Sequence, residues 1–159
     1  RELGIQGVLF YGAAYATMNL GAFAVVAALQ RRPGVTSQIS SFAGLGRRAP
    51  LLGIAMTLFL LSLVGIPPTA GFFAKTMIVL SAVQGGGWLT VLGVILMLNA
   101  AAAAFYYLRV VVTMYMRDPA ENAKPIEVGG WTRLGLVIAA AGTVAIGLIP
   151  PVTGAVLDW

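Results

Sequence analysis

The sequence has 159 residues, of which 59% are hydrophobic and only 9% are charged, whereas charged residues make up about a quarter of soluble domains. This composition excludes an ordinary soluble domain and indicates an integral membrane protein, and the net charge of +5 comes largely from one loop between apolar segments, which argues against nucleic-acid binding. Because cysteine and histidine are both absent, the chain has no disulfides, thiolate metal ligands or iron–sulfur ligands, and we expect no redox centre in it.

Four segments are long enough to cross the roughly 30 Å hydrocarbon layer, which takes about 20 helical residues. The sequence predicts spans over residues 5–29, 51–83, 88–116 and 132–149. We therefore expect an all-α integral membrane fold of four transmembrane helices, forming one membrane domain over residues 1–159. Because no initiating methionine precedes the first span, we expect the chain to be a piece of a longer protein.

The loops between the spans predict the orientation of the chain. The loop over residues 30–50 carries four arginines and no acidic residue, the loop over 117–131 carries mixed charges, and the turn at 84–87 carries none. Lys and Arg accumulate on the cytoplasmic side of a membrane, so both long loops are expected inside, and the turn and both chain ends outside. The four arginines are Arg31, Arg32, Arg47 and Arg48.

The second predicted span is interrupted near its middle. Pro67 and Pro68 remove two backbone donors, and Gly65 and Gly71 add backbone freedom on either side. We expect one discontinuous helix broken over Gly65–Gly71, because neither half is long enough to cross alone. The alternatives are a simple proline kink, two short spans or a re-entrant pair.

Lys75 follows this break and lies about 13 Å along the helix from the outer turn, near the middle of the membrane. A lysine at that depth costs roughly 2.5–3.5 kcal/mol to insert, so it is expected to face the bundle interior, a partner or water. Burial lets a lysine exist in charged or neutral form, which a proton relay requires. The alternative is a structural ion pair with a carboxylate outside this sequence, since no carboxylate lies within any span.

Few other polar groups are available for a relay. Asn99 lies at a comparable depth and is expected to make an interhelical hydrogen bond; the alternatives are that it holds a water or bonds to Lys75. Arg109 is expected to be an orientation anchor first and a relay residue second. Three hydroxyl residues are expected to satisfy carbonyls that the break frees, and two polar residues of the first span are expected to pack or to line water. These five residues are Ser62, Thr69, Thr76, Tyr15 and Asn19.

Three segments carry a resemblance to a known family. The sequence VGIPPTAGFFAK (residues 64–75) resembles the broken-helix lysine segment of the antiporter-like subunits of respiratory complex I and of multisubunit cation/proton antiporters. The segments NLGAF (19–23) and YYLRV (106–110) look most like the subunit N family of NADH–quinone oxidoreductase, called subunit 2 in mitochondria. The resemblance covers nearly the whole chain in the right order and spacing.

The resemblance implies a fourteen-helix antiporter-like fold, of which this chain is similar to the last four helices. It implies that Lys75 is the terminal lysine of a buried relay that exchanges protons toward the outer side. The sister subunit M carries glutamate at this position, so the lysine favours subunit N. The remaining relay groups, two further lysines and a glutamate, are expected upstream of this sequence.

The function implied is proton translocation in the bacterial plasma (inner) membrane, coupled to quinone reduction elsewhere in the complex. NADH, FMN, iron–sulfur clusters and quinone are expected in other subunits, with no cofactor or metal bound by this chain. The expected partners are other membrane subunits of complex I, including sister antiporter-like subunits, together with the lipid bilayer and protons. The alternatives are a subunit of a sodium(cation)/proton antiporter and a passive scaffold with Lys75 in a structural ion pair.

Overall fold

The computed structural model describes residues 2–31, 38–119, 126 and 128–152, with side chains described from residue 4 to residue 148 of that part. All regular elements within this described part are helices, so the expected all-α fold is confirmed there. The elements are α1 (Glu2–Gln30), the 3-10 helix η1 (Ile39–Phe42), α2 (Leu45–Arg48), α3 (Pro50–Val64), α4 (Ala70–Gly85), α5 (Trp88–Met116) and α6 (Gly130–Val152).

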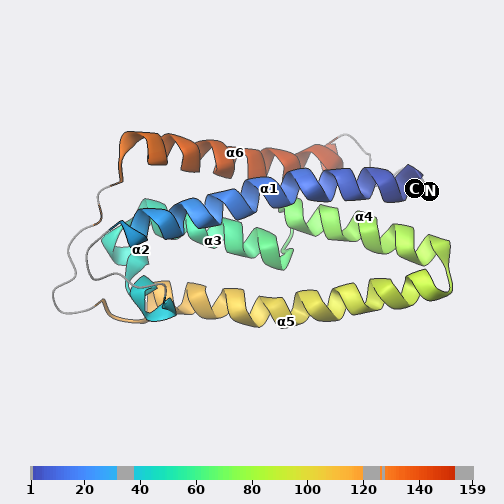
Figure 1. The fold of residues 1–159 in the computed structure, drawn as a ribbon, viewed down its shortest axis with the longest axis horizontal. Helices are drawn as coiled ribbons and strands as arrows, with labels where there is room; N and C mark the ends of the chain where they lie inside the picture. The colour runs from blue at the N-terminus through green and yellow to red at the C-terminus, as the bar shows by residue number, and fades with distance from the viewer. Residues whose placement is uncertain (1, 32–37, 120–125, 127, 153–159) are drawn as a thin grey trace.

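The long helices lie side by side and form an elongated bundle (Figure 1). Helix α1 packs against α3, α4 and α6, while α5 runs back along both α3 and α4. Helices α3 and α4 point in the same direction and follow one another along the bundle. Among the described residues, α1, α5 and α6 are long and apolar enough to cross a membrane, whereas α3 and α4 are shorter apolar helices.

The core lies between α1 and α3. The buried face of α1 repeats every three or four residues, as the helical period requires, and α3 packs the side chain of Phe59 against this face. Phe59 is fully buried, and its ring contacts the position where Gly21 of α1 lacks a side chain. The buried residues of α1 are Ala14, Met18, Ala22, Val25 and Leu29.

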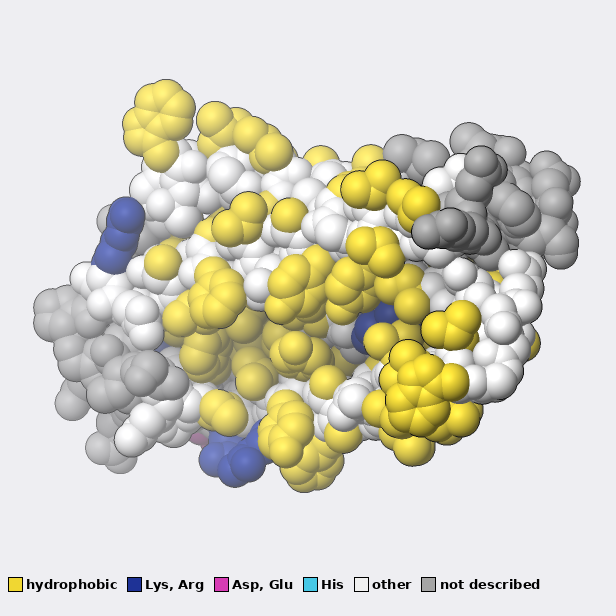
Figure 2. Space-filling model, turned by 45° about the vertical axis from the view of Figure 1, so that its right-hand side comes forward, with side chains coloured by type: hydrophobic (Ala, Val, Ile, Leu, Met, Phe, Trp, Pro, Cys, Tyr) yellow, Lys and Arg dark blue, Asp and Glu magenta, His cyan; other side chains and the backbone are white. Residues whose placement is uncertain are grey.

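Much of the remaining apolar surface is exposed. Leu9, Phe23, Leu98 and Phe105 are each more than 60% exposed, and Figure 2 shows apolar side chains gathered over one face of the molecule. Exposed apolar side chains on this scale indicate a surface that contacts lipid or other membrane helices.

Several expected boundaries shift in the structure. The break is shorter than expected, because α4 begins at Ala70 and Gly71 is already helical. Helix α6 begins two residues before the expected fourth span and continues to Val152. The described part of the expected 30–50 loop contains η1 and α2. Backbone N–H groups in this part bond to carbonyls three or four residues earlier, as in short helices.

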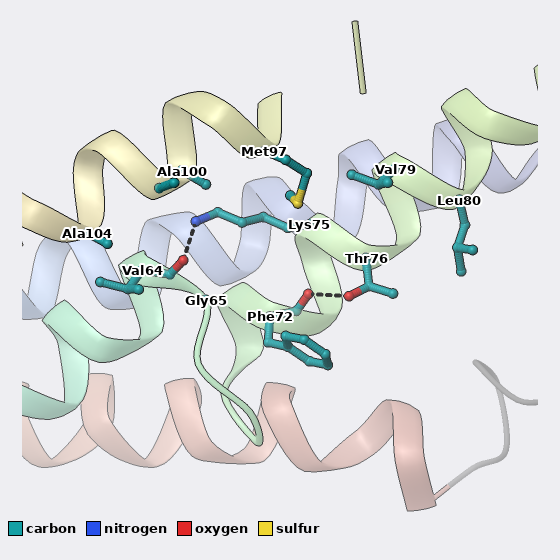
Figure 3. A pocket seen from close by; sticks show the side chains of 11 residues that line it. Val64, Gly65, Phe72, Lys75, Thr76, Val79, Leu80, Met97, Ala100 and Ala104 are labelled. Atoms are coloured by element: carbon teal, nitrogen blue, oxygen red, sulfur yellow. Dashed lines mark hydrogen bonds between the residues drawn. The ribbon is translucent and has the colours of Figure 1, made fainter. Parts of the chain in front are cut away.

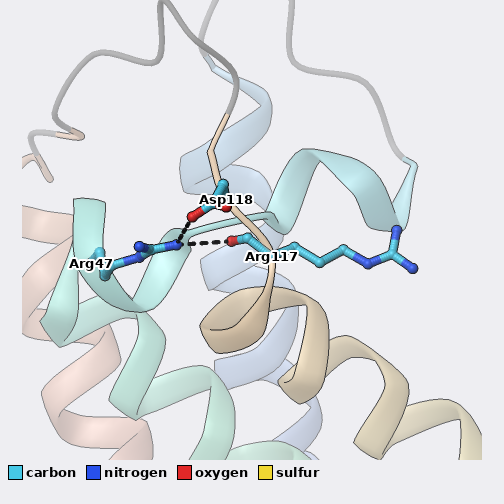
Figure 4. Close-up of polar contacts among 3 residues, drawn as sticks. All are labelled: Arg47, Arg117 and Asp118. Carbon is cyan, nitrogen blue, oxygen red and sulfur yellow. Dashed lines mark hydrogen bonds and ion pairs between the residues drawn. The ribbon is translucent and has the colours of Figure 1, made fainter.

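The two long loops meet at one end of the bundle. Arg47 of α2 donates a hydrogen bond of 2.6 Å to Asp118 Oδ1, which follows α5, and another of 3.4 Å to the carbonyl of Arg117 (Figure 4). Tyr115 of α5 also contacts Gly46 and lies within 3.3 Å of the Thr57 hydroxyl. Both loops therefore lie at the same end of the helices, as the charge pattern predicts. Arg32 and residues 120–125 lie outside the described residues.

Candidate functional site

The break between α3 and α4 occupies residues 65–69. Gly65 ends α3 in the left-handed conformation, with φ of +92°, and its N–H bonds to the Leu61 carbonyl at 3.0 Å. This conformation is unfavourable for residues with a side chain, so glycine is suited to it. Thr69 precedes α4, and its hydroxyl donates a 2.7 Å hydrogen bond to the Ile66 carbonyl within the break.

The last turn of α3 and the first turn of α4 contact each other directly. The Gly71 N–H donates a hydrogen bond of 3.2 Å to the hydroxyl oxygen of Ser62, which is fully buried. The backbones approach so closely here that a Cβ on Gly71 would collide with the Ser62 carbonyl oxygen. Gly71 is therefore needed for close approach rather than for a turn.

Helix α6 covers the break on another side. A Cβ on Gly147 would lie 2.6 Å from the amide nitrogen of Ala70 and 2.7 Å from the Pro68 carbonyl oxygen. Non-helical backbone persists at membrane depth only where protein covers it or where it lines a cavity. The small residue in α6 lets that helix provide the cover.

Lys75 lies one turn into α4, and its side chain returns to the end of α3. Its Nζ donates hydrogen bonds of 2.7 Å to the Leu63 carbonyl and 2.8 Å to the Val64 carbonyl. These carbonyls belong to the last turn of α3, where no further helical N–H is available and where the helix dipole is negative. The ammonium thus replaces the missing helical donors and lies at the favourable end of the dipole.

The side chain of Lys75 borders a cavity of about 380 Å³ between α3, α4 and α5 (Figure 3). The lining is mostly apolar, and Lys75 and Thr76 provide its polar side chains. Three alanines of α5 (Ala100, Ala101 and Ala104) border the cavity, so their small side chains leave space there instead of closing the helices on each other. A cavity of this size is large enough to hold water molecules.

The other candidate residues are placed differently. Thr76 lines the cavity, but its hydroxyl bonds to the Phe72 carbonyl of its own helix at 2.9 Å rather than to the break. Ser62 accepts an N–H instead of donating to a freed carbonyl. Asn99 and Arg109 are exposed on α5, and the described residues that border the cavity do not include them.

The polar residues of α1 also lie apart from Lys75. Tyr15 is 42% exposed and stacks on Tyr11 with ring centroids 5.8 Å apart. Asn19 is half-buried, and Thr17 faces Gly142 of α6. Among the described residues, the structure therefore brings together Lys75, Thr76 and the carbonyls at the end of α3, and leaves Asn99, Arg109, Tyr15 and Asn19 outside this group.

Sequence reasoning missed the two carbonyls that bind Lys75. Their signal lies in the sequence, because the last carbonyls of any helix that stops at a proline pair need donors from elsewhere. A lysine eleven and twelve residues after Val64 and Leu63 is such a donor. Whether it reaches them depends on how the two half-helices are offset, which only the folded arrangement determines.

Comparison with known proteins places this chain in a family. Residues 1–114 match the family described as "NADH:quinone oxidoreductase/Mrp antiporter, TM". The chain is 44% identical over 148 residues to NADH-quinone oxidoreductase subunit N of Trichlorobacter lovleyi, and the alignment covers 92% of this chain and 30% of that protein. It is 40% identical over 164 residues to subunit N of Myxococcus xanthus, and this alignment covers 100% of this chain and 30% of that protein.

The fold is also similar to that of a solved structure. A chain of respiratory complex I from Thermus thermophilus matches with a TM-score of 0.73 and 30% sequence identity, over 92% of this chain and 33% of that one. The chain thus spans about a third of the length of the proteins it matches. Because the family match extends over most of its 159 residues, this chain belongs to the NADH:quinone oxidoreductase/Mrp antiporter family of membrane proteins.

Proposed function

We propose that this chain is part of the proton-translocating subunit N of NADH–quinone oxidoreductase, in which Lys75 takes up and releases protons. The observation that carries the proposal is the position of the Lys75 ammonium, bound to two carbonyls at the end of a broken helix and open to a cavity. The relatives support the choice of subunit, since those compared above are named as subunit N.

The chemistry of the site suits a group that changes its charge. When Lys75 is protonated, its ammonium has three donors, of which two are bound by the Leu63 and Val64 carbonyls. The third donor is available to water or to a partner in the cavity, which gives a route for the proton to leave. Loss of the proton removes the charge that the negative end of α3 stabilises. The protonation state of Lys75 therefore determines how strongly its side chain interacts with the end of α3.

The proposed membrane arrangement has four spans, with α3 and α4 forming one discontinuous span. Their 15 and 16 residues correspond to about 23 and about 24 Å of helix, each short of the roughly 30 Å core. Together they exceed one crossing. The chain would supply the last part of a fourteen-helix antiporter-like subunit, with the arginine-bearing end inside and the 84–87 turn outside.

The partners proposed follow from the same assignment. The chain would contact other membrane subunits of the complex, including sister antiporter-like subunits, in the bacterial inner membrane. NADH oxidation and quinone reduction would take place in other subunits, which would hold the FMN and the iron–sulfur clusters. The role of this chain in the enzyme is to translocate protons.

The test uses the full-length subunit in the assembled complex, reconstituted in vesicles. We expect Lys75→Ala to lower NADH-driven proton uptake relative to the rate of NADH oxidation, because the group that carries the proton is gone. Arg133→Ala is the control, since it removes an exposed cation at the start of α6 that does not border the cavity. Normal proton uptake per NADH in Lys75→Ala would show that the proposed function is wrong.

A further inference from the structure

Ser62 differs in its hydrogen bonding from four threonines within the helices. Four threonines, one each in α3, α4, α5 and α6, donate a hydrogen bond from the hydroxyl to the carbonyl four residues earlier in their own helix, at 2.8–2.9 Å. Ser62 instead accepts the Gly71 N–H from the next helix, across the break, and its side chain is fully buried. The threonines are Thr57, Thr76, Thr113 and Thr143.

The turn that holds Ser62 also presents the carbonyls that bind Lys75. Leu63 and Val64 follow Ser62 directly, and Gly71 precedes Lys75 by one helical turn. The two helix ends are therefore joined by two parallel bridges, one from Gly71 to Ser62 and one from Lys75 to the Leu63 and Val64 carbonyls. A change in the Gly71–Ser62 hydrogen bond alters the relative position of the two helix ends, and the hydrogen bonds of Lys75 depend on that position.

The geometry points to Ser62 as a positioning residue, which holds the end of α3 where its carbonyls reach the Lys75 ammonium. This inference rests on the proposed function of Lys75. Removal of the hydroxyl leaves the buried Gly71 N–H without an acceptor, which is unfavourable in a low-dielectric interior. The first turn of α4 then shifts toward another acceptor, and the ammonium and the carbonyls separate.

The experiment compares Ser62→Ala with Thr143→Val in the full-length subunit of the assembled complex. Thr143→Val is a matched control because it also removes a fully buried hydroxyl, but one that bonds within a single helix. The quantity measured is the number of protons translocated per electron, together with the amount of assembled complex. A merely structural defect lowers the amount of complex and both rates together, and leaves this ratio unchanged.

We expect Ser62→Ala to show about half or more of the loss in ratio that Lys75→Ala shows, since one hydrogen bond accounts for a roughly two- to tenfold change in an equilibrium. Thr143→Val is expected to keep the wild-type ratio. If Ser62→Ala does not assemble, Ser62→Cys is measured instead, because it is similar in size and a weak acceptor, and it is expected to lower the ratio partly.

A wild-type ratio in the Ser62 variant, or equal losses in Ser62 and Thr143 variants, would overturn this inference. The proposed function fails separately, by a wild-type ratio in Lys75→Ala. The two failures are therefore distinguished within one set of measurements.

Discussion

At the scale of single residues, the site depends on a lysine whose partners are main-chain atoms. The depth of Lys75 and its position after the proline pair are visible in the sequence, and they suffice to select it as the candidate. The carbonyls of Leu63 and Val64 are not visible in the same way, because every residue has a carbonyl and only the offset of the two half-helices selects these two.

A substitution at Gly71 tests the close contact between α3 and α4. In Gly71→Ala the new Cβ meets the Ser62 carbonyl, which is rigid backbone, so α3 and α4 must move apart. We expect a loss of stability of about 1–3 kcal/mol, the usual cost of overpacking, and a lower midpoint in thermal unfolding of the purified complex.

Gly135→Ala is the control for this substitution, since a Cβ at that position of α6 meets no atom within 4 Å among the described residues. Alanine is favoured over glycine in a helix by up to about 1 kcal/mol, so this variant is expected to be as stable as the wild type or more so. Equal unfolding midpoints for the two variants would contradict the close approach at Gly71.

At the scale of elements, α1 packs against both α3 and α4, the two helices that flank the break. Apolar runs, Pro50 at the start of α3 and the glycine turn before α5 are sequence signals, and helices lie where these signals predict them. The sequence predicts the end of the break two residues too late, because a glycine after a proline pair suggests backbone freedom at Gly71. Its lack of a side chain serves instead for contact between helices, which no local pattern reveals.

A substitution at Phe59 tests the packing of α1 on α3, because its fully buried ring fills the space between these helices. Phe59→Ala leaves a cavity at this contact. We expect a loss of about 1–3 kcal/mol in unfolding free energy, less than the roughly 3–5 kcal/mol of a soluble core because lipid also solvates apolar groups.

Phe105→Ala is the matched comparison, since it removes the same side chain from a position on α5 that is 69% exposed. We expect it to change the unfolding free energy less than Phe59→Ala does. A larger effect at Phe105 would show that the contact between α1 and α3 is not the one that supports this bundle.

At the scale of the whole molecule, the two ends of the bundle differ: the charged loops lie at one end and the uncharged 84–87 turn lies at the other. The Arg47–Asp118 pair joins both long loops at one end, and the 84–87 turn lies at the other end of α4 and α5. The charge pattern alone predicted that these loops share a side. The contact that joins them could not be predicted, because it depends on the fold of η1 and α2 within the loop.

The orientation can be tested with single cysteines, because these 159 residues contain none. Gln84 and Gly129 are both exposed and lie at opposite ends of the bundle. With a membrane-impermeant maleimide, we expect Gln84→Cys to react in intact cells and Gly129→Cys to react only in inverted vesicles, because we propose that the arginine-bearing end is cytoplasmic. Reaction of Gly129→Cys in intact cells would reverse the proposed orientation.

The central claim is that Lys75 carries a proton, and Lys75→Arg tests it most directly. Arginine keeps the positive charge and can donate to the α3 carbonyls, but it hardly releases a proton. The decisive measurement is the number of protons translocated per electron by the assembled complex with this substitution. Proton transfer through Lys75 predicts an assembled complex with a lowered ratio, whereas a wild-type ratio would show that Lys75 supplies a fixed structural charge.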